Sequence, residues 1–139
     1  MKFTTTVLEI SPGPGFSLQN ITHLVNEFVA SAAVQEGQLV AFFKHTTGSI
    51  FIGEHESGIV ADIERALEAL APINGEYLHH KREWDFNGSA HVRAAFMPTS
   101  IVIPIHEGSM VLGMHQEIMV TNGQPEEFPR YVVLQVMGE

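Results

Sequence analysis

Three dense apolar runs near the end of the chain constrain its fold more than any other feature. Residues 100–105 are rich in Ile and Val, residues 110–121 alternate in character, and residues 130–136 are almost continuous Val, Leu and Tyr. Runs of β-branched and aromatic residues with a period of two are typical of strands. Turn signals at Glu107-Gly108 and Asn122-Gly123 separate them. We therefore predict three successive strands.

The rest of the chain mixes strands with helices. The alternation over residues 2–10 predicts a first strand. Apolar residues spaced by three and four predict a helix from about residue 18 to 32, capped by Ser17, and a second helix over residues 57–70. Other expected elements are paired strands at 38–44 and 49–52, a long polar loop at 76–88, and a short helix at 90–97 capped by Ser89.

The order of these elements favours a single α+β domain over residues 1–139. Strands and helices are grouped without repeated βαβ units, which predicts mixed, mostly antiparallel β-sheets with two or three helices. The run at 110–121 carries apolar residues on both alternating faces, such as Met110 and Leu112 on one and Val111 on the other. A small domain has difficulty covering both faces of such a strand, so we expect self-association.

Charge and composition exclude several classes of function. The chain has 7 Lys+Arg against 16 Asp+Glu, a net charge of -9, which opposes binding to nucleic acid or to an anionic membrane. We find no signal-peptide pattern at the beginning and no run of about 18 apolar residues, so we expect a cytoplasmic protein without a membrane partner. The absence of cysteine leaves His, Asp, Glu, Ser and Thr to carry any chemistry.

Histidines are the most prominent candidates for chemistry. There are eight: His45 ends a predicted strand, His80 lies in the predicted loop and His91 lies near a helix start, positions from which side chains of distant segments converge in clefts. Imidazole both binds metals and titrates near neutral pH. The pattern therefore leaves open a divalent metal site, with Zn or Mg, and an acid–base site.

Cations gather beside these histidines. Lys44 precedes His45, Lys81 and Arg82 follow His80, and Arg93 lies two residues beyond His91. Lys and Arg hold phosphate through charge-assisted hydrogen bonds. These four residues therefore predict phosphate contacts, with a small phosphorylated molecule as the partner.

The spacing of further residues resembles the YjbQ-like family, also called secondary thiamine-phosphate synthases. The matching residues run over nearly the whole chain: His45-Thr46-Thr47-Gly48-Ser49, Glu54, Tyr77 to His80, Asn87 to His91 followed by Val92-Arg93-Ala94, Ser100, Ile103-Pro104, Gly108, Gly113 and Gln116. The chain departs from the family pattern after Glu54, where Ser57-Gly58-Ile59 replaces an acidic run, and at His115, which replaces a tryptophan.

The resemblance implies a fold, an assembly and an activity. It implies an α+β homotrimer with a His-bearing cleft, and an enzyme that joins a pyrimidine diphosphate to a thiazole phosphate. His45, Glu54, His80 and His91 match the family's characteristic polar positions and are the expected catalytic set. Arg130 falls near the family's C-terminal arginine.

Three functions remain open at this point. The first is a thiamine-phosphate synthase-like enzyme that acts on small phosphorylated substrates. The second is a non-catalytic trimer that binds a metal or a phosphorylated metabolite. The third is a metal-dependent phosphate-ester hydrolase, which would use the same residues with a metal-activated water.

Overall fold

The computed structural model describes residues 1–139, except for the side chain of Glu83. In chain order the elements are β1 (Lys2–Ile10), β2 (Ser17–Asn20), α1 (Thr22–Ala32), β3 (Gly37–Phe43), β4 (Gly48–Gly53), α2 (Ser57–Leu70), α3 (Leu78–Glu83), α4 (Gly88–Ala95), β5 (Ser100–His106), β6 (Ser109–Met110), β7 (Glu117–Asn122) and β8 (Arg130–Gly138). The strands form a five-stranded sheet, ordered β1-β8-β3-β5-β6, and a three-stranded sheet, ordered β2-β7-β4. Every pairing is antiparallel.

Strict alternation places one face of the five-stranded sheet in the core. Along β5 the side chains of Ile101, Ile103 and Ile105 are buried, while the residues between them are exposed. Alternation along β8 buries every second residue from Val132 to Val136 in the same way. In a strand with this pattern, the side chains on one face pack into the core and those on the other face point away from it.

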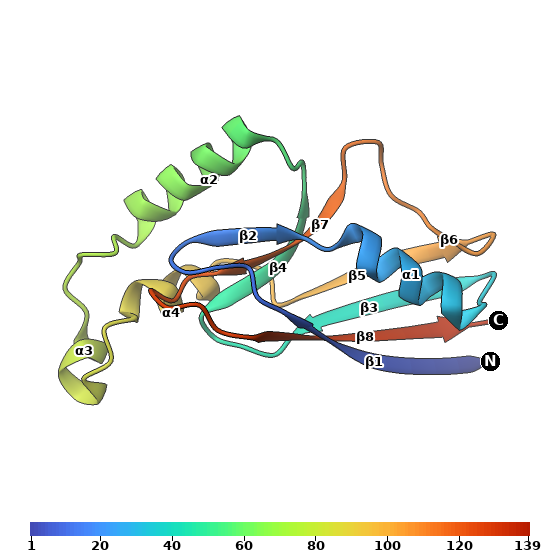
Figure 1. Ribbon diagram of the computed structural model, residues 1–139, viewed down its shortest axis with the longest axis horizontal. Helices are drawn as coiled ribbons and strands as arrows, with labels where there is room; N and C mark the ends of the chain where they lie inside the picture. Colours follow the sequence, from blue (N-terminus) through green and yellow to red (C-terminus); the bar gives the residue numbers. More distant parts are fainter.

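The core lies between this face, helix α1 and the three-stranded sheet (Figure 1). Helix α1 buries Val25 and Val29. Its first turn is tied to β7, because the Ile21 amide donates to the Ile118 carbonyl and the Ile118 amide donates to Thr22 Oγ1, both at 2.8 Å. None of the described helices is long and apolar enough to cross a membrane.

Helix α2 stands away from the sheets (Figure 1). Leu67 is its one buried residue among those described. The helix begins where the Glu56 carboxylate accepts hydrogen bonds from the Gly58 and Ile59 amides, which caps the free amides of the first turn. Its bounds agree with the helix predicted over residues 57–70.

The outer face of the five-stranded sheet is apolar and exposed. The register aligns Val7, Val133 and Phe42 in one row, and Val40 and Val102 share the next row with the polar residues Gln135 and Thr5. Phe42 is 47% exposed and Val102 is 57% exposed. An apolar patch that crosses four strands is unusual on a monomer.

Two predicted elements have different boundaries or partners. The first helix begins at Thr22, not near residue 18, because β2 pairs with β7. Ser17 is not its cap: its hydroxyl donates to the Pro14 carbonyl, and Asn20 Oδ1 accepts from the Thr22 amide instead. β3 and β4 are not paired but belong to different sheets.

The predicted strand over residues 110–121 is also wrong, because β6 and β7 lie in different sheets. The Gly113 amide donates to Gln116 Oε1 within the loop that separates them. The structure has four helices where two or three were predicted, since α3 occupies part of the expected loop at 76–88. Helix α4 begins at Gly88, so Ser89 lies inside it instead of capping it.

Candidate functional site

A cleft of about 490 Å³ opens where several element ends meet. Its walls come from the turn after β3, the segment that leads into α4, and the loop that leads into β8. Lys44, His45, His91 and Arg130 line it together with one carboxylate, Asp85. The cleft therefore gathers two permanent cations and two imidazoles around one acid.

Arg130 is the most deeply placed charge in the cleft, with 3% of its surface exposed. Its Nη2 donates to Thr47 Oγ1 at 2.9 Å, to the Thr47 carbonyl at 3.3 Å, and to Asn122 Oδ1. Its Nε is buried and has no hydrogen-bond partner in the described chain. Burial lowers the pKa of the guanidinium, which still remains charged because arginine does not deprotonate in proteins.

Asn122 connects the loops that surround Arg130. It is fully buried, and its Nδ2 donates to the carbonyls of Gly13, Gly15, Gln124 and Glu126 at 2.8–3.3 Å. One side chain thus joins the loop after β1 to the loop before β8. Such a buried and satisfied network favours a single arrangement of the cleft.

His45 is fixed in a neutral form. The Tyr131 amide donates to His45 Nε2 at 2.8 Å, so the remaining ring proton lies on Nδ1. Burial, followed by the charges of Arg130 and Lys44, lowers the pKa of this imidazole below its ordinary value. His45 is therefore an uncharged donor through Nδ1 near neutral pH.

His91 is also kept largely neutral. Burial and the neighbouring His79 lower its pKa, while Asp85 and a hydrogen bond with the Thr46 backbone act in the opposite direction. The His79 and His91 rings meet edge to face with centroids 4.8 Å apart. His79 Nε2 in turn lies 3.1 Å from Asn87 Oδ1, another wall residue of the cleft.

The predicted site residues do not all reach this cleft. Lys44, His45 and His91 do. His80 and Lys81 instead line a separate groove beside it. Arg82 is exposed.

Glu54 lies at the opposite end of β4 from the cleft. It follows the last strand residue, Gly53, whereas the cleft residue Thr47 precedes the first. Six strand residues separate the two positions by about 20 Å. Glu54 Oε1 is 3.4 Å from His115 Nδ1. Within one chain, Glu54 therefore cannot share a ligand with His45.

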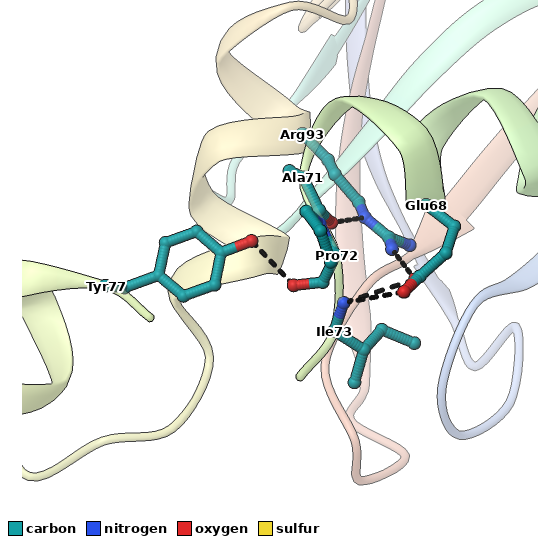
Figure 2. A network of polar contacts seen from close by, with 6 residues as sticks. All are labelled: Glu68, Ala71, Pro72, Ile73, Tyr77 and Arg93. Atoms are coloured by element: carbon teal, nitrogen blue, oxygen red, sulfur yellow. Dashed lines mark hydrogen bonds and ion pairs between the residues drawn. The ribbon is translucent and has the colours of Figure 1, made fainter. Parts of the chain in front are cut away.

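Arg93 is occupied by structural contacts (Figure 2). Its Nε donates to the Ala71 carbonyl at 2.9 Å and its Nη2 to Glu68 Oε2 at 2.7 Å. Glu68 also accepts from the Ile73 amide, and the Tyr77 hydroxyl donates to the Pro72 carbonyl at 2.6 Å. The guanidinium therefore joins the end of α2 to α4 and lies outside the cleft.

The described residues do not fit the predicted metal set within one chain. No group of three or more His, Asp or Glu side chains, among those that the structure describes, could hold a metal ion. His45 Nε2 and His80 Nε2 both accept backbone amides, from Tyr131 and Gly88. We therefore derive no chemical step through a metal, and the ligand set of His45, His80 and His91 stays a prediction.

Comparison with known proteins decides the family. A family model described as UPF0047 protein YjbQ-like matches residues 6–139. The chain belongs to the YjbQ-like family. A UPF0047 protein of Methanothermobacter thermautotrophicus is 35% identical over 118 residues, which cover 85% of this chain and 81% of that one. A UPF0047 protein of Synechocystis is 29% identical over 126 residues, which cover 90% and 86%.

Solved structures of YjbQ-like proteins share the fold. A protein of unknown function from Sulfolobus solfataricus has a TM-score of 0.93 at 26% identity, covering 99% of both chains. An uncharacterized protein of the family from Clostridium acetobutylicum has a TM-score of 0.86 at 28% identity, covering 95% of this chain and 99% of that one. The match confirms the α+β fold with antiparallel sheets.

Sequence reasoning missed part of the cleft in this YjbQ-like chain. Arg130 was noted for its place near a family arginine, but not as a predicted phosphate contact. His79 and Asp85 lie in the predicted loop as polar candidates, but the predicted catalytic, phosphate and metal sets include neither of them, nor Asn122. The sequence does carry a signal for Arg130, because it is the only Lys or Arg in the last third of the chain.

Proposed function

We propose that the cleft binds a small phosphorylated molecule, with Arg130 and Lys44 as its charge contacts. The observation that carries this proposal is the bonding of Arg130, whose recorded partners are neutral oxygens and whose buried Nε is unpaired. A buried charge without a counter-charge is costly, and an anion in the cleft would offset that cost. Lys44 is exposed at the rim and adds a second, more mobile cation.

The two histidines suit a ligand with exchangeable protons. His45 offers Nδ1–H as a neutral donor, and burial together with His79 keeps His91 largely neutral against the opposing charge of Asp85. The neutral His91 ring can accept a proton as a general base and return it once protonated. His45 donates a hydrogen bond through Nδ1, because its Nε2 already accepts the Tyr131 amide. We propose transfer chemistry on the phosphorylated ligand as the enzymatic form of this function.

Binding is tested by calorimetry with inorganic phosphate and with pyrophosphate. Lys44→Met should weaken the binding of pyrophosphate by about tenfold, the usual scale of a charge-assisted contact. Lys2→Met is the matched control, since Lys2 lies on β1 and its Nζ donates to the Ala33 carbonyl. Equal binding by the two variants would contradict the proposal, as would the absence of any anion binding.

Arg130→Lys tests the deeper contact. Lysine keeps the positive charge but cannot reproduce the fork of donors to Thr47 and Asn122. We expect weaker anion binding in a chain that still folds, checked by circular dichroism. Unchanged affinity would remove Arg130 from the proposed site.

A thiamine-phosphate synthase-like reaction is the specific transfer that we propose to assay. Purified protein is supplied with the pyrimidine diphosphate, the thiazole phosphate and Mg²⁺, and the condensed product is measured. Product that disappears in His91→Ala would support an enzyme. Binding of the substrates without formation of product would support a non-catalytic protein that binds phosphorylated metabolites.

Phosphate-ester hydrolysis and metal binding are tested separately. Generic phosphate esters are assayed with added Zn²⁺, Mn²⁺ or Mg²⁺, and metal content is measured by mass spectrometry in wild type and His91→Ala after identical purification. Stoichiometric metal lost in the variant would support the predicted ligand set. A wild type without metal would count against it.

We propose in addition that the chain assembles as a homotrimer through the outer face of the five-stranded sheet. Val7, Val133, Phe42, Val40 and Val102 form an apolar patch on this face that reaches four strands. Burial of such a patch stabilises association by removing apolar surface from water.

A further inference from the structure

Three of the five asparagines in the chain are followed by glycine, at Asn74, Asn87 and Asn122. An Asn-Gly pair is prone to deamidation, because glycine has no Cβ to shield its amide nitrogen from the preceding side chain. The reaction requires an asparagine side chain that can turn toward that nitrogen and a backbone that can bend with it. The fold holds the three pairs differently in both respects.

Asn122-Gly123 is locked by its surroundings. Asn122 is fully buried, its Nδ2 donates to four carbonyls around the cleft, and its Oδ1 accepts from Arg130. The Gly123 amide donates to the Thr47 carbonyl at 2.8 Å. Attack by this nitrogen would break the whole network, so we expect the pair to be stable in the folded chain.

Asn87-Gly88 is held in a similar way. Asn87 is 3% exposed, and its Oδ1 lies 3.1 Å from His79 Nε2. The Gly88 amide donates to His80 Nε2 at 2.9 Å, and Gly88 is the first residue of α4. The nitrogen is therefore engaged by a ring, and the helix fixes the backbone around it.

Asn74-Gly75 lies in the connection between α2 and α3. Asn74 is exposed, and its side chain makes no hydrogen bond with the residues that the structure describes. The turn is closed by one hydrogen bond, which the Gly75 amide donates to the Pro72 carbonyl at 3.1 Å. A surface turn of this kind opens without disturbing the core.

Both flanks of this turn are anchored, as Figure 2 shows. The Ile73 amide donates to the Glu68 carboxylate, and the Tyr77 hydroxyl donates to the Pro72 carbonyl at 2.6 Å. Because Tyr77 bonds the same carbonyl as Gly75, release of the Gly75 amide leaves that carbonyl with a partner. Opening can therefore be confined to the Asn-Gly pair itself.

We propose that Asn74 is a site of spontaneous deamidation. The Gly75 nitrogen attacks Asn74 Cγ, the Cγ–Nδ2 bond breaks, and ammonia leaves with the proton of the Gly75 amide. Water then opens the cyclic imide at either of its two carbonyls, which gives aspartate or isoaspartate at position 74. Water is the one co-reactant, and the chain gains a negative charge at its surface.

Peptide mapping of the intact chain tests this site. Trypsin cuts after Lys and Arg, which separates the three Asn-Gly pairs into peptides 66–81, 83–93 and 94–130. Folded protein is aged in mildly alkaline buffer at physiological temperature, then digested briefly at mildly acidic pH beside an unaged sample. We expect a mass gain of about 1 Da, the difference between an amide and a carboxyl group, that grows with time in peptide 66–81 alone. Methylation by a protein-isoaspartate methyltransferase identifies the isoaspartate.

A sample aged in guanidinium chloride separates the effect of sequence from that of structure. There all three peptides should gain mass, because unfolding frees Asn87 and Asn122. A folded chain in which peptide 66–81 gains no mass would overturn the proposal. So would a folded chain in which the three peptides gain mass at equal rates.

Variants locate the reacting atoms. Asn74→Gln moves the amide one methylene away from the Gly75 nitrogen and should remove the mass gain of peptide 66–81. Gly75→Ala should slow that gain, because a Cβ shields the nitrogen. Asn26→Gln is the matched control and should age as the wild type, because Asn26 is exposed but is followed by Glu27. A mass gain that persists at the wild-type rate in Asn74→Gln would overturn the proposal.

Discussion

His45 makes the stability of the chain depend on pH. The Tyr131 amide occupies Nε2, and burial together with the charges of Arg130 and Lys44 lowers the pKa below 6.5. The unfolded chain therefore binds this proton more readily than the folded one. Stability is complete above the unfolded pKa and falls as the pH drops through the interval down to the lowered folded pKa.

Urea unfolding at two pH values checks this dependence. Between about pH 7.5 and about pH 5.5, the wild type should lose more free energy of unfolding than His45→Gln, which does not titrate. His23→Gln serves as control, since the His23 side chain is 84% exposed. A pH dependence that His45→Gln leaves unaltered would show that this imidazole contributes nothing to it.

Gly88 leaves room for the Tyr77 and His80 rings to pack against its backbone. A Cβ at this position would lie 2.6 Å from Tyr77 Cγ and 2.9 Å from His80 Nε2. Gly88→Ala should therefore destabilise the chain by about 1–3 kcal/mol, the usual cost of overpacking. Gly113→Ala is the control, because the nearest atom there belongs to the flexible Gln116 side chain. Denaturant unfolding of both variants measures the difference, and equal stability would refute the clash.

At the scale of elements, Arg93 couples α2 to α4. Arg93→Met would leave the Ala71 carbonyl without this donor and Glu68 without its counter-charge. We expect a loss of about 1–3 kcal/mol in the free energy of unfolding. Arg65→Met should cost less than about 0.5 kcal/mol, because Arg65 is 81% exposed and pairs with Asp62 on the surface. Similar losses of unfolding free energy in the two variants, measured by urea unfolding, would contradict this coupling.

The elements that sequence predicted best are those with local causes. Residues 57–70 carry their periodicity and their breaking residues within the segment, so α2 has the expected bounds. Leu18 continues a helical spacing, yet it belongs to β2, because β7 offers a partner about a hundred residues away. The residues around Leu18 give no indication of that pairing.

The candidate site likewise contains residues that the local sequence predicts and residues that it does not. Lys44 and His45 share a turn, and His91 lies on the helix whose start borders the cleft, so their grouping was predictable. Arg93 follows His91 by two residues and faces α2 instead, since residues two apart on a helix point in different directions. Arg130 reaches the cleft only through the pairing of β8, which no local pattern reveals.

At the scale of the molecule, the apolar patch on the outer face of the sheet favours self-association, and the proposed assembly is a homotrimer. Sedimentation velocity should give a species near three times the chain mass of 15.3 kDa. Phe42→Lys should shift it toward the monomer, because a charge would be buried in the contact. Phe96→Lys should not, since that exposed residue follows α4 and lies off this face. A wild type that sediments as a monomer would overturn the proposed homotrimer.

The strand order also dictates when the chain can fold during its synthesis. β8 lies between β1 and β3, and its last paired residue, Gly138, is matched with Lys2 and Gly37. A nascent chain that has not yet reached this strand lacks the middle of its larger sheet and the Arg130 that it places in the cleft. Such non-local pairing is slow and leaves strand edges open meanwhile. Until β8 has been synthesised, β1 has no partner in its sheet and β3 can pair only with β5, so the edges of both strands that β8 later covers stay open.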